Sequence, residues 1–259
     1  MINDLIPYSA CPICQSRMLI EQKRADLTKH PLYKPQLDPV IIWMVCGTCG
    51  HNFRSGHYQD WALDIIFSET HENQKLGYRL ENQRPVSARM IEKVTPFCSS
   101  GDWLDVGFGN GSLLLTAAEY GFNPVGLDLR SDNAHALKHI GLESYCERIE
   151  NLTFDGRFSV LSMADVLEHV PFPLDILKAA YRLLRAEGVL FLSMPNTEAP
   201  VWKLLDLANA NPYWAEIEHY HNFGRSQLSK ILEDNGFNPV RYGISERYRA
   251  CMEILAIKN

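Results

Sequence analysis

The stretch WLDVGFGNG, residues 103–111, decides the fold of this chain. An apolar run ends in an acid, glycines follow at every second position, and residues 112–120 then have a helical pattern. This order predicts a strand, a tight turn and the first turn of a helix. Glycines carry no Cβ, so a ligand can lie against the backbone while the N–H groups of the helix N-terminus point toward it. The stretch therefore predicts a site for a nucleotide-like cofactor.

The spacing of the glycines separates this turn from two other nucleotide-binding turns. Ser112 stands where the dinucleotide fingerprint G-x-G-x-x-G has its third glycine, and no Gly-Lys-Ser/Thr follows to make a P-loop. The pattern D-V-G-x-G-x-G resembles the first motif of class I S-adenosylmethionine-dependent methyltransferases. The resemblance implies that the turn binds S-adenosylmethionine through Asp105, Gly107, Phe108, Gly109, Asn110 and Gly111.

Later segments extend this resemblance. Residues 124–129 predict a second strand that ends in Asp128, and an acid at this distance can accept hydrogen bonds from both ribose hydroxyls. Residues 158–170 and 183–192 resemble the fourth-strand motif of the family and its turn into the fifth strand. The resemblance implies an α/β Rossmann-like fold with a seven-stranded, mostly parallel sheet. It also implies that the other cofactor contacts are made by Leu129, Glu147, Arg148, Asp165 and Val166.

Each of these acids also has a plainer interpretation. Asp128 or Asp165, taken singly, is as well explained as a local cap or turn carboxylate. Four motifs in the family's order, at the spacing of one domain, favour cofactor binding.

The N-terminal segment carries two C-x-x-C knuckles, formed by Cys11, Cys14, Cys46 and Cys49. Four thiolates in this pattern can surround one structural zinc ion. The 31 residues between the knuckles exceed the usual spacing of about 15–20 residues, so an extra hairpin or loop is expected within residues 21–39. Disulfides are disfavoured because Asp4 stands where a signal peptide would have a basic region, so a reducing cytoplasmic location is expected. His51 could stand in as a ligand, but a solvated histidine is the favoured interpretation.

Composition sets further bounds. The 259 residues are 46% hydrophobic and 22% charged, enough for one α/β core and a small added module. Apolar runs stay well below the roughly 18 residues of a membrane span. The net charge is −6, and the basic residues are scattered. This pattern disfavours a nucleic-acid partner, which usually requires concentrated positive charge.

Three segments follow from these patterns. Residues 1–56 are the predicted zinc-binding module, residues 57–97 a helical linker or lid, and residues 98–259 the methyltransferase domain with a substrate-side insertion at 195–225. The predicted flanking elements are helices at 60–67, 85–94, 201–208 and 226–235 and strands at 239–242 and 252–257.

The candidate catalytic residues lie in that insertion and after the fourth strand. Methyl transfer is an in-line displacement, so the protein supplies alignment and a base. Residues 218–223, EHYHNF, resemble the Glu-His-x-x-Tyr-Phe segment of zinc-containing sugar C-methyltransferases, although Asn222 replaces the tyrosine. The resemblance implies that Glu218 and His219 meet the substrate and that His219 takes part in proton transfer. His169 is the rival base, and it could instead cap the following helix.

The favoured function is methylation of a small molecule such as a sugar, a nucleotide-sugar or a secondary metabolite. An RNA base methyltransferase that holds RNA with its zinc module is one alternative, but no Asn-Pro-Pro-Tyr type of site and no catalytic-cysteine motif is visible. The second alternative is a non-catalytic binding protein with this fold. The sequence leaves open the acceptor atom and the oligomeric state.

Overall fold

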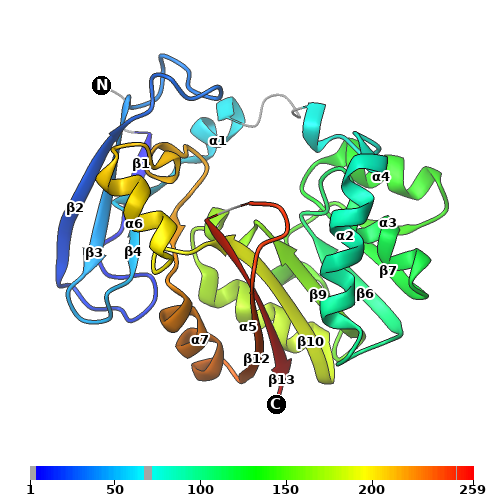
Figure 1. The fold of residues 1–259 in the computed structure, drawn as a ribbon. Helices are drawn as coiled ribbons and strands as arrows, with labels where there is room; N and C mark the ends of the chain where they lie inside the picture. The colour runs from blue at the N-terminus through cyan, green and yellow to red at the C-terminus, as the bar shows by residue number, and fades with distance from the viewer. Residues whose placement is uncertain (1–3, 67–71, 249) are drawn as a thin grey trace. The chain divides into compact units, whose positions relative to one another are not determined.

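The computed structural model describes residues 4–66, 72–248 and 250–259 and divides into two compact units (Figure 1). The cysteine unit comprises residues 1–69, 168–174 and 195–228. The sheet unit comprises residues 70–167, 175–194 and 229–259. Residues 57–66 and 195–225 thus group with the cysteine knuckles. Phe67, the last residue of the first predicted helix, lies outside the described residues.

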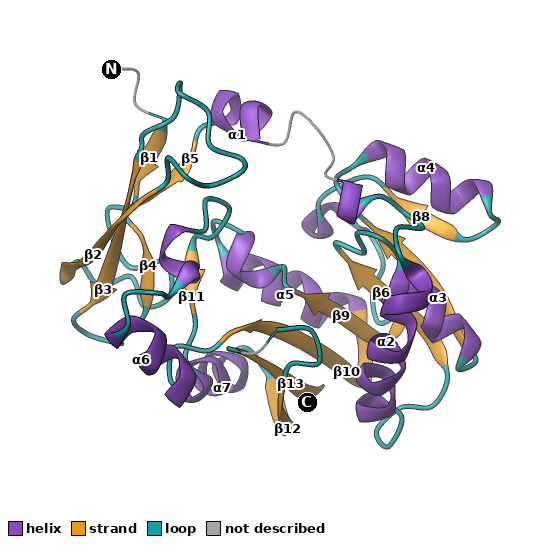
Figure 2. Cartoon of the chain, turned by 45° about the horizontal axis from the view of Figure 1, so that its top comes forward, coloured by secondary structure: helices purple, strands orange, loops and turns teal. Residues whose placement is uncertain are grey.

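The sheet unit is built on a seven-stranded sheet of order β12-β13-β10-β9-β6-β7-β8, whose strands are drawn in orange in Figure 2. The strands are β6 (Gly101–Val106), β7 (Phe122–Leu127), β8 (Glu143–Tyr145), β9 (Phe158–Ala164), β10 (Leu184–Pro195), β12 (Phe237–Ile244) and β13 (Cys251–Lys258). The strands from β10 to β8 pair in parallel, while β12 and β13 pair antiparallel. The predicted Rossmann-like, mostly parallel sheet is confirmed. Its order reverses between β6 and β9, where open α/β sheets bind ligands at the carboxyl ends of the strands.

Helices cover this sheet because its strands are apolar on both faces. All seven residues of β9 are buried, as expected for a parallel strand with both faces covered. On one face, α2 (Leu80–Val94) and α3 (Ser112–Glu119) pack Ile91 and Leu113 against Trp103. Burial of each such side chain contributes about 1.5–3 kcal/mol. The helix α2 begins five residues before the predicted start and contains Pro85 within it.

The remaining helices are short. They are α1 (Asp60–Ile66), α4 (Ser131–His139), α5 (Pro173–Leu183), α6 (Pro200–Leu207) and α7 (Arg225–Asp234), with 3-10 turns η1 (Glu72–Gln74), η2 (Ile149–Asn151), η3 (Leu167–His169) and η4 (Pro212–Ala215). Within residues 4–66, 72–248 and 250–259, no helix has the length and apolar character to cross a bilayer.

The cysteine unit contains two small antiparallel sheets. One has the order β11-β4-β3-β2, formed by β2 (Leu19–Asp26), β3 (Val40–Cys46), β4 (Asn52–Arg54) and β11 (His221–Asn222). The other pairs β1 (Leu5–Pro7) with β5 (Gly56–Tyr58). The hairpin β2–β3 fills the long spacing between the knuckles, as expected from the sequence.

Aromatic packing joins the distant segments of the cysteine unit. Trp43 of β3 is fully buried, and its Nε1–H donates to the carbonyl of Trp214 at 2.8 Å. The two indole rings meet edge to face at 5.6 Å, and Trp202 of α6 meets Trp214 at 5.4 Å. Residues 195–225 therefore complete a core that the N-terminal strands begin.

Candidate functional site

The glycine turn follows β6 as predicted. Gly107, Gly109 and Gly111 all have positive φ, at 65°, 52° and 79°. The N–H of Gly107 donates to the carbonyl of Leu127 at 2.7 Å, which ties the turn to β7. A Cβ on Gly107 would lie 2.8 Å from Cγ2 of Val166. Glycine is required there by both conformation and space, so the end of β6 presents bare backbone.

Two buried acids flank this turn. Asp128 follows β7 and is 4% exposed; its carboxylate accepts hydrogen bonds from the N–H groups of Gly109 at 3.2 Å and Arg130 at 2.9 Å. Asp105 of β6 is 3% exposed and accepts from the Ser162 hydroxyl at 2.6 Å. Burial raises the pKa of Asp105 to about 6, although the bond from Ser162 opposes the rise. Buried carboxylates beside bare backbone suit a ligand that carries ribose hydroxyls and positive charge, as S-adenosylmethionine does.

The other predicted cofactor residues differ in exposure. Phe108 is 5% exposed and packs against Leu114 and Leu137. Leu129 and Arg148 are exposed, and Glu147 is half-buried.

Asp165 follows β9 in a left-handed conformation, with φ of 60°. Its carboxylate accepts from the Ser193 hydroxyl at 3.2 Å and pairs with Arg247 at 3.5 Å. Val166, the next residue, contacts the glycine turn as described above.

The side chains of Asn133 and Asn110 link the glycine turn to the segment before α2, which was not predicted. We call these two side chains the clasp. The Asn133 side chain of α4 accepts from the N–H of Leu76 at 3.0 Å and donates to the carbonyls of Gln74 at 2.9 Å and Gly109 at 3.1 Å. The Asn110 side chain donates to the carbonyl of Tyr78 at 2.9 Å. The available sequence signal was an asparagine in the segment that follows Asp128, and the structure shows that it is buried in the first turn of α4.

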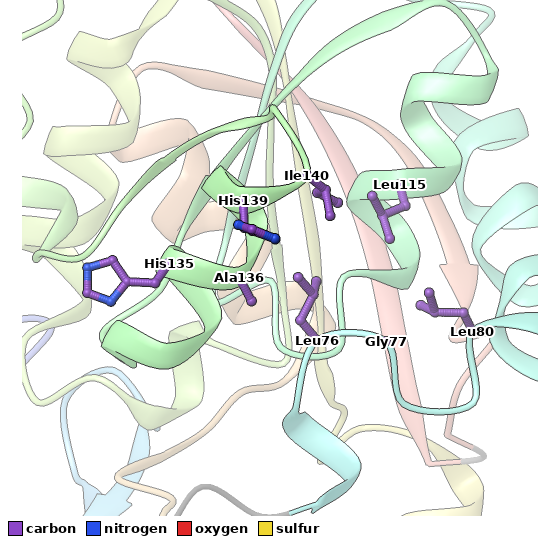
Figure 3. Close-up of a pocket in the computed structure, with 8 residues that line it drawn as sticks. All are labelled: Leu76, Gly77, Leu80, Leu115, His135, Ala136, His139 and Ile140. Carbon is purple, nitrogen blue, oxygen red and sulfur yellow. The ribbon is translucent and has the colours of Figure 1, made fainter.

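Figure 3 shows an apolar pocket beside the clasp, lined by the segment at Leu76, by α4 and by Leu115 of α3. Its lining comprises Leu76, Gly77, Leu80, Leu115, His135, Ala136, His139 and Ile140. None of these is a predicted cofactor residue, but the pocket adjoins the glycine turn, because a Cβ on Gly111 would lie 2.5 Å from Cδ1 of Leu76 and the Gly77 N–H donates to the carbonyl of Asn110 at 3.0 Å.

The four knuckle cysteines of the cysteine unit converge. Their sulfur atoms all lie within 4.8 Å of one another, with Cys11 and Cys49 at 3.7 Å and Cys14 and Cys46 at 3.5 Å. Tetrahedral Zn–S bonds of about 2.3 Å require sulfur separations of about 3.8 Å, so the arrangement fits a zinc ion. Burial acts to raise the pKa of the Cys46 thiol, but the backbone N–H groups of Cys49 and Thr48 lower it to about 6. The His51 imidazole hydrogen-bonds to Gln227 and His221 instead, and it is fully buried, so the expectation of a solvated histidine was wrong.

A second cluster in the cysteine unit contains Glu168, His169 and His219, whose potential ligand atoms lie within 4.8 Å of one another. The two imidazole rings meet edge to face at 4.6 Å. Nδ1 of His169 lies 3.2 Å from the carbonyl of Glu218. A carbonyl only accepts, so Nδ1 carries the proton and Nε2 of the neutral ring has the lone pair. The structure thus brings His169 and His219 together and joins Glu218 to them through its backbone.

The pKa of His219 is shifted by its surroundings. Burial, aided by His169, lowers the pKa of His219 to about 3, so His219 is neutral at pH 7. Its Nδ1 is buried and has no hydrogen-bond partner. Glu216 lies nearby with its Oε1 2.8 Å from Nε2 of His30. Burial acts to raise the pKa of Glu216, but the His30 contact and the neighbouring histidines lower it to about 2. Glu216 and His30 were not predicted, because no local pattern marks them, and Glu168 lies in the predicted fourth-strand motif without a predicted role.

Aromatic rings line one side of His219. Tyr213 stacks on it at 6.4 Å, and Trp202 stacks on Tyr213 at 5.2 Å. Ligand sites commonly combine such aromatic walls with a few polar groups.

The parallel sheet, the glycine turn and its buried acids define a class I S-adenosylmethionine-dependent methyltransferase. Residues 78–242 match the family model described as a methyltransferase domain, and the chain belongs to that family.

Named relatives agree with this assignment. A ubiquinone biosynthesis O-methyltransferase of Idiomarina loihiensis is 33% identical over 204 residues, which cover 70% of this chain and 84% of that protein. A protein of the same name from Xanthomonas oryzae pv. oryzae is 36% identical over 101 residues, and the match spans 42% of its length.

Solved structures share the fold. The 1,6-didemethyltoxoflavin-N1-methyltransferase of Burkholderia thailandensis, with bound S-adenosylhomocysteine, has a TM-score of 0.59 at 18% identity and covers 81% of this chain and 96% of its own. The magnesium protoporphyrin IX methyltransferase of Synechocystis, also with bound S-adenosylhomocysteine, has a TM-score of 0.53 at 19% identity and covers 79% and 90%. The protein is an S-adenosylmethionine-dependent methyltransferase.

Proposed function

We propose that the protein methylates a hydroxyl group of a small molecule, either a sugar, a nucleotide-sugar or a secondary metabolite, held at the Glu168–His169–His219 cluster. The observation that carries the proposal is the fixed tautomer of His169, whose ring meets the ring of the buried, neutral His219 edge to face at 4.6 Å. The relatives named as O-methyltransferases support a hydroxyl acceptor. The aromatic walls at Tyr213 and Trp202 suit a sugar or an aromatic ring.

The sheet unit binds the methyl donor in this proposal. S-adenosylmethionine supplies a methyl group on a positively charged sulfur, which keeps the bonding electrons when the group leaves. The glycine turn leaves room for the donor, Asp128 accepts from its ribose, and Asp105 balances its positive charge. Glu147 and Arg148 remain the proposed adenine contacts, and Asp165 and Val166 the residues after β9 that border the donor.

His169 takes the proton from the acceptor. The hydroxyl oxygen forms its bond to the methyl carbon while its proton passes to Nε2 of His169. The Glu218 carbonyl holds the opposite N–H, so the ring keeps its orientation. His219, with its pKa lowered to about 3, stays neutral and orients the acceptor by accepting a hydrogen bond at Nδ1. We therefore place proton transfer on His169 rather than on His219, the residue that the sequence favours.

We also propose that the four knuckle cysteines bind a structural zinc ion. The sulfur separations of 3.5 and 3.7 Å support this proposal. The ion would tie the turn at residues 11–14, which lies between β1 and β2, to the turn at residues 46–49, which joins β3 to β4.

The test is a screen of candidate acceptors with labelled S-adenosylmethionine, followed by mass spectrometry of the product. We expect a methyl ether. His169→Gln is expected to lower kcat about 10²- to 10⁴-fold, the usual contribution of a general base. His219→Gln is expected mainly to raise KM for the acceptor, and His57→Gln, a half-buried histidine of the same unit outside the cluster, serves as the control.

Several outcomes would contradict the proposal. A methyl group on carbon would exclude the hydroxyl acceptor, and unchanged turnover of His169→Gln would exclude the base. Stimulation by added Mg²⁺ or Mn²⁺ would mean that the cluster acts as a cation site. Salt-sensitive methylation of RNA would favour the nucleic-acid alternative.

A further inference from the structure

Among the residues that the structure describes, Arg54 of β4 is the only buried arginine, and it has no exposed surface. Of its three guanidinium nitrogens, Nη1 donates to the carbonyl of Ile217 at 3.0 Å. Nε and Nη2 are buried and have no hydrogen-bond partner. The Nε–H group and one Nη2–H group point in parallel from the same side of the planar guanidinium, which we call the free edge of Arg54.

The charge of Arg54 has no counter-ion in the described part of the chain. No carboxylate forms an ion pair with it there. A buried charge is costly unless a counter-ion and hydrogen bonds compensate it. The half-buried arginines, in contrast, each pair with an acid, and they are Arg130, Arg157, Arg182 and Arg247. The most deeply buried guanidinium therefore lacks the partner that the less buried ones have.

Aromatic packing holds the guanidinium in place but does not satisfy the free edge. Cζ of Arg54 lies 4.0 Å from the centroid of the Tyr58 ring, and Tyr58 meets Tyr220 at 6.1 Å. Stacking on the face of a ring offsets part of the cost of the charge, but it leaves the in-plane N–H donors without acceptors. The Tyr58 hydroxyl is also buried without a hydrogen-bond partner. The free edge is thus a pair of oriented donors that lacks an acceptor.

The position of Arg54 connects it to the acceptor cluster. Its backbone N–H donates to the carbonyl of Tyr220 at 2.8 Å, and its side chain holds the carbonyl of Ile217. These two residues lie on either side of His219 in the sequence. The Tyr220 N–H in turn donates to the carbonyl of Glu168 at 2.8 Å. Arg54 is therefore fixed to the segment that carries the cluster.

We propose that the free edge of Arg54 binds a carboxylate or phosphate group of the methyl acceptor. Two oxygen atoms of such an oxyanion can accept the two parallel N–H bonds, the geometry in which arginine recognises both groups. The charge of the ligand then compensates the buried guanidinium. Because Arg54 has no exposed surface, the oxyanion enters when the unit opens locally.

The proposal narrows the class of acceptor. It favours a nucleotide-sugar or an acidic metabolite and excludes a neutral sugar. The oxyanion site follows from Arg54 alone, whereas its assignment to the methyl acceptor rests on the proposed function.

The first test measures the melting temperature of the full chain in inorganic phosphate and in acetate, with chloride at equal ionic strength as the reference. We expect at least one oxyanion to raise the melting temperature by about 3 °C, as for a site filled at about ten times its Kd. A larger response to phosphate indicates a phosphorylated acceptor, and a larger response to acetate indicates a carboxylic acid. No response to either salt would overturn the proposal.

Two variants assign the response to Arg54. Arg54→Met removes an uncompensated buried charge, so we expect it to melt no lower than the wild type in chloride and to lose the response. Arg54→Lys keeps a charge without the planar fork and is expected to lose at least about half of the response. A full response in either variant would overturn the proposal. A melting temperature lowered by more than about 5 °C in Arg54→Met would also overturn it, because the guanidinium would then stabilise the fold without a ligand.

Arg24→Met is the matched control. Arg24 lies on β2 of the same unit, is exposed and pairs with Glu21 at 2.7 Å. We expect this variant to respond to phosphate and acetate as the wild type does. If it loses the response as Arg54→Met does, the salts act on the overall charge of the unit and the site at Arg54 is refuted.

A kinetic measurement separates this proposal from the proposed function. We expect the acceptor found by the screen to carry a carboxylate or phosphate group. Arg54→Lys is then expected to raise KM for that acceptor at least about tenfold while kcat stays within about threefold. A neutral acceptor, or an unchanged KM, would refute the assignment of the oxyanion to the acceptor. If no acceptor is methylated, the proposed function fails, but the melting temperatures still decide whether Arg54 binds an oxyanion.

Discussion

Replacing Asp105 by asparagine tests the electrostatic design of the cofactor site. The buried carboxyl has a pKa of about 6, compared with 3.8 for an ordinary aspartate. Between these values the folded protein binds more protons than the unfolded chain, so this group's stabilising contribution is complete below about pH 4 and is lost as pH rises through 6. Above that range, the shift of about two pH units makes the charged form cost about 3 kcal/mol.

Asp105→Asn removes this cost and keeps the hydrogen bond from Ser162, because the amide oxygen still accepts it. We expect the variant, without cofactor, to be more stable than the wild type at pH 7.5 by up to about 3 kcal/mol. The difference should shrink toward zero near pH 4. Urea unfolding followed by circular dichroism at several pH values measures it.

Asp102→Asn is a matched control on the same strand. Asp102 is partly exposed and pairs with Arg157, so its loss should cost at most about 1 kcal/mol at pH 7.5. If Asp105→Asn is no more stable than the wild type at pH 7.5, or if its advantage persists at pH 4, the reasoning is wrong. Because the charge is proposed to pair with the cofactor, the same variant should bind S-adenosylmethionine about 10- to 100-fold more weakly.

Three further predictions concern the turn, the metal and the aromatic core. Gly107→Ala should weaken S-adenosylhomocysteine binding and cost about 1–3 kcal/mol, because its φ is positive and its Cβ would meet Val166; unchanged calorimetric affinity would contradict this. Elemental analysis should find one zinc ion per chain, and removing it with a chelator should lower the melting temperature by at least about 5 °C, whereas metal-free protein of equal stability would exclude the zinc site. Trp43→Phe should cost about 2–4 kcal/mol in urea unfolding, because it leaves the Trp214 carbonyl buried without its donor; a loss below about 1 kcal/mol would show that the contact matters little.

Local sequence patterns predicted much of the sheet unit and the convergence of the cysteines. The run from Trp103 to Gly111 carries its own strand, turn and helix start, because apolar periodicity and glycine conformations act over a few residues. The same holds for α6 and α7, whose observed bounds lie within one residue of the predicted ones. The knuckle spacing likewise specified which four sulfur atoms meet.

The features that the sequence did not predict depend on contacts between residues far apart in the chain. No local pattern indicates that Trp43 bonds to Trp214, so residues 195–225 were expected to belong with the sheet. The pairing of His169 with His219 likewise joins segments fifty residues apart. The low pKa of His219 arises from burial, which sequence motifs do not express.

The discontinuous path of the cysteine unit has a consequence for folding during synthesis. The first 66 residues contribute β1 to β5 and α1, but their largest buried side chain, Trp43, finds its partner only when residue 214 has been made. Strands β6 to β10 all emerge from the ribosome before that point. The first segment to be translated is therefore among the last to complete its core, and it must wait, with apolar surface exposed, for most of the chain.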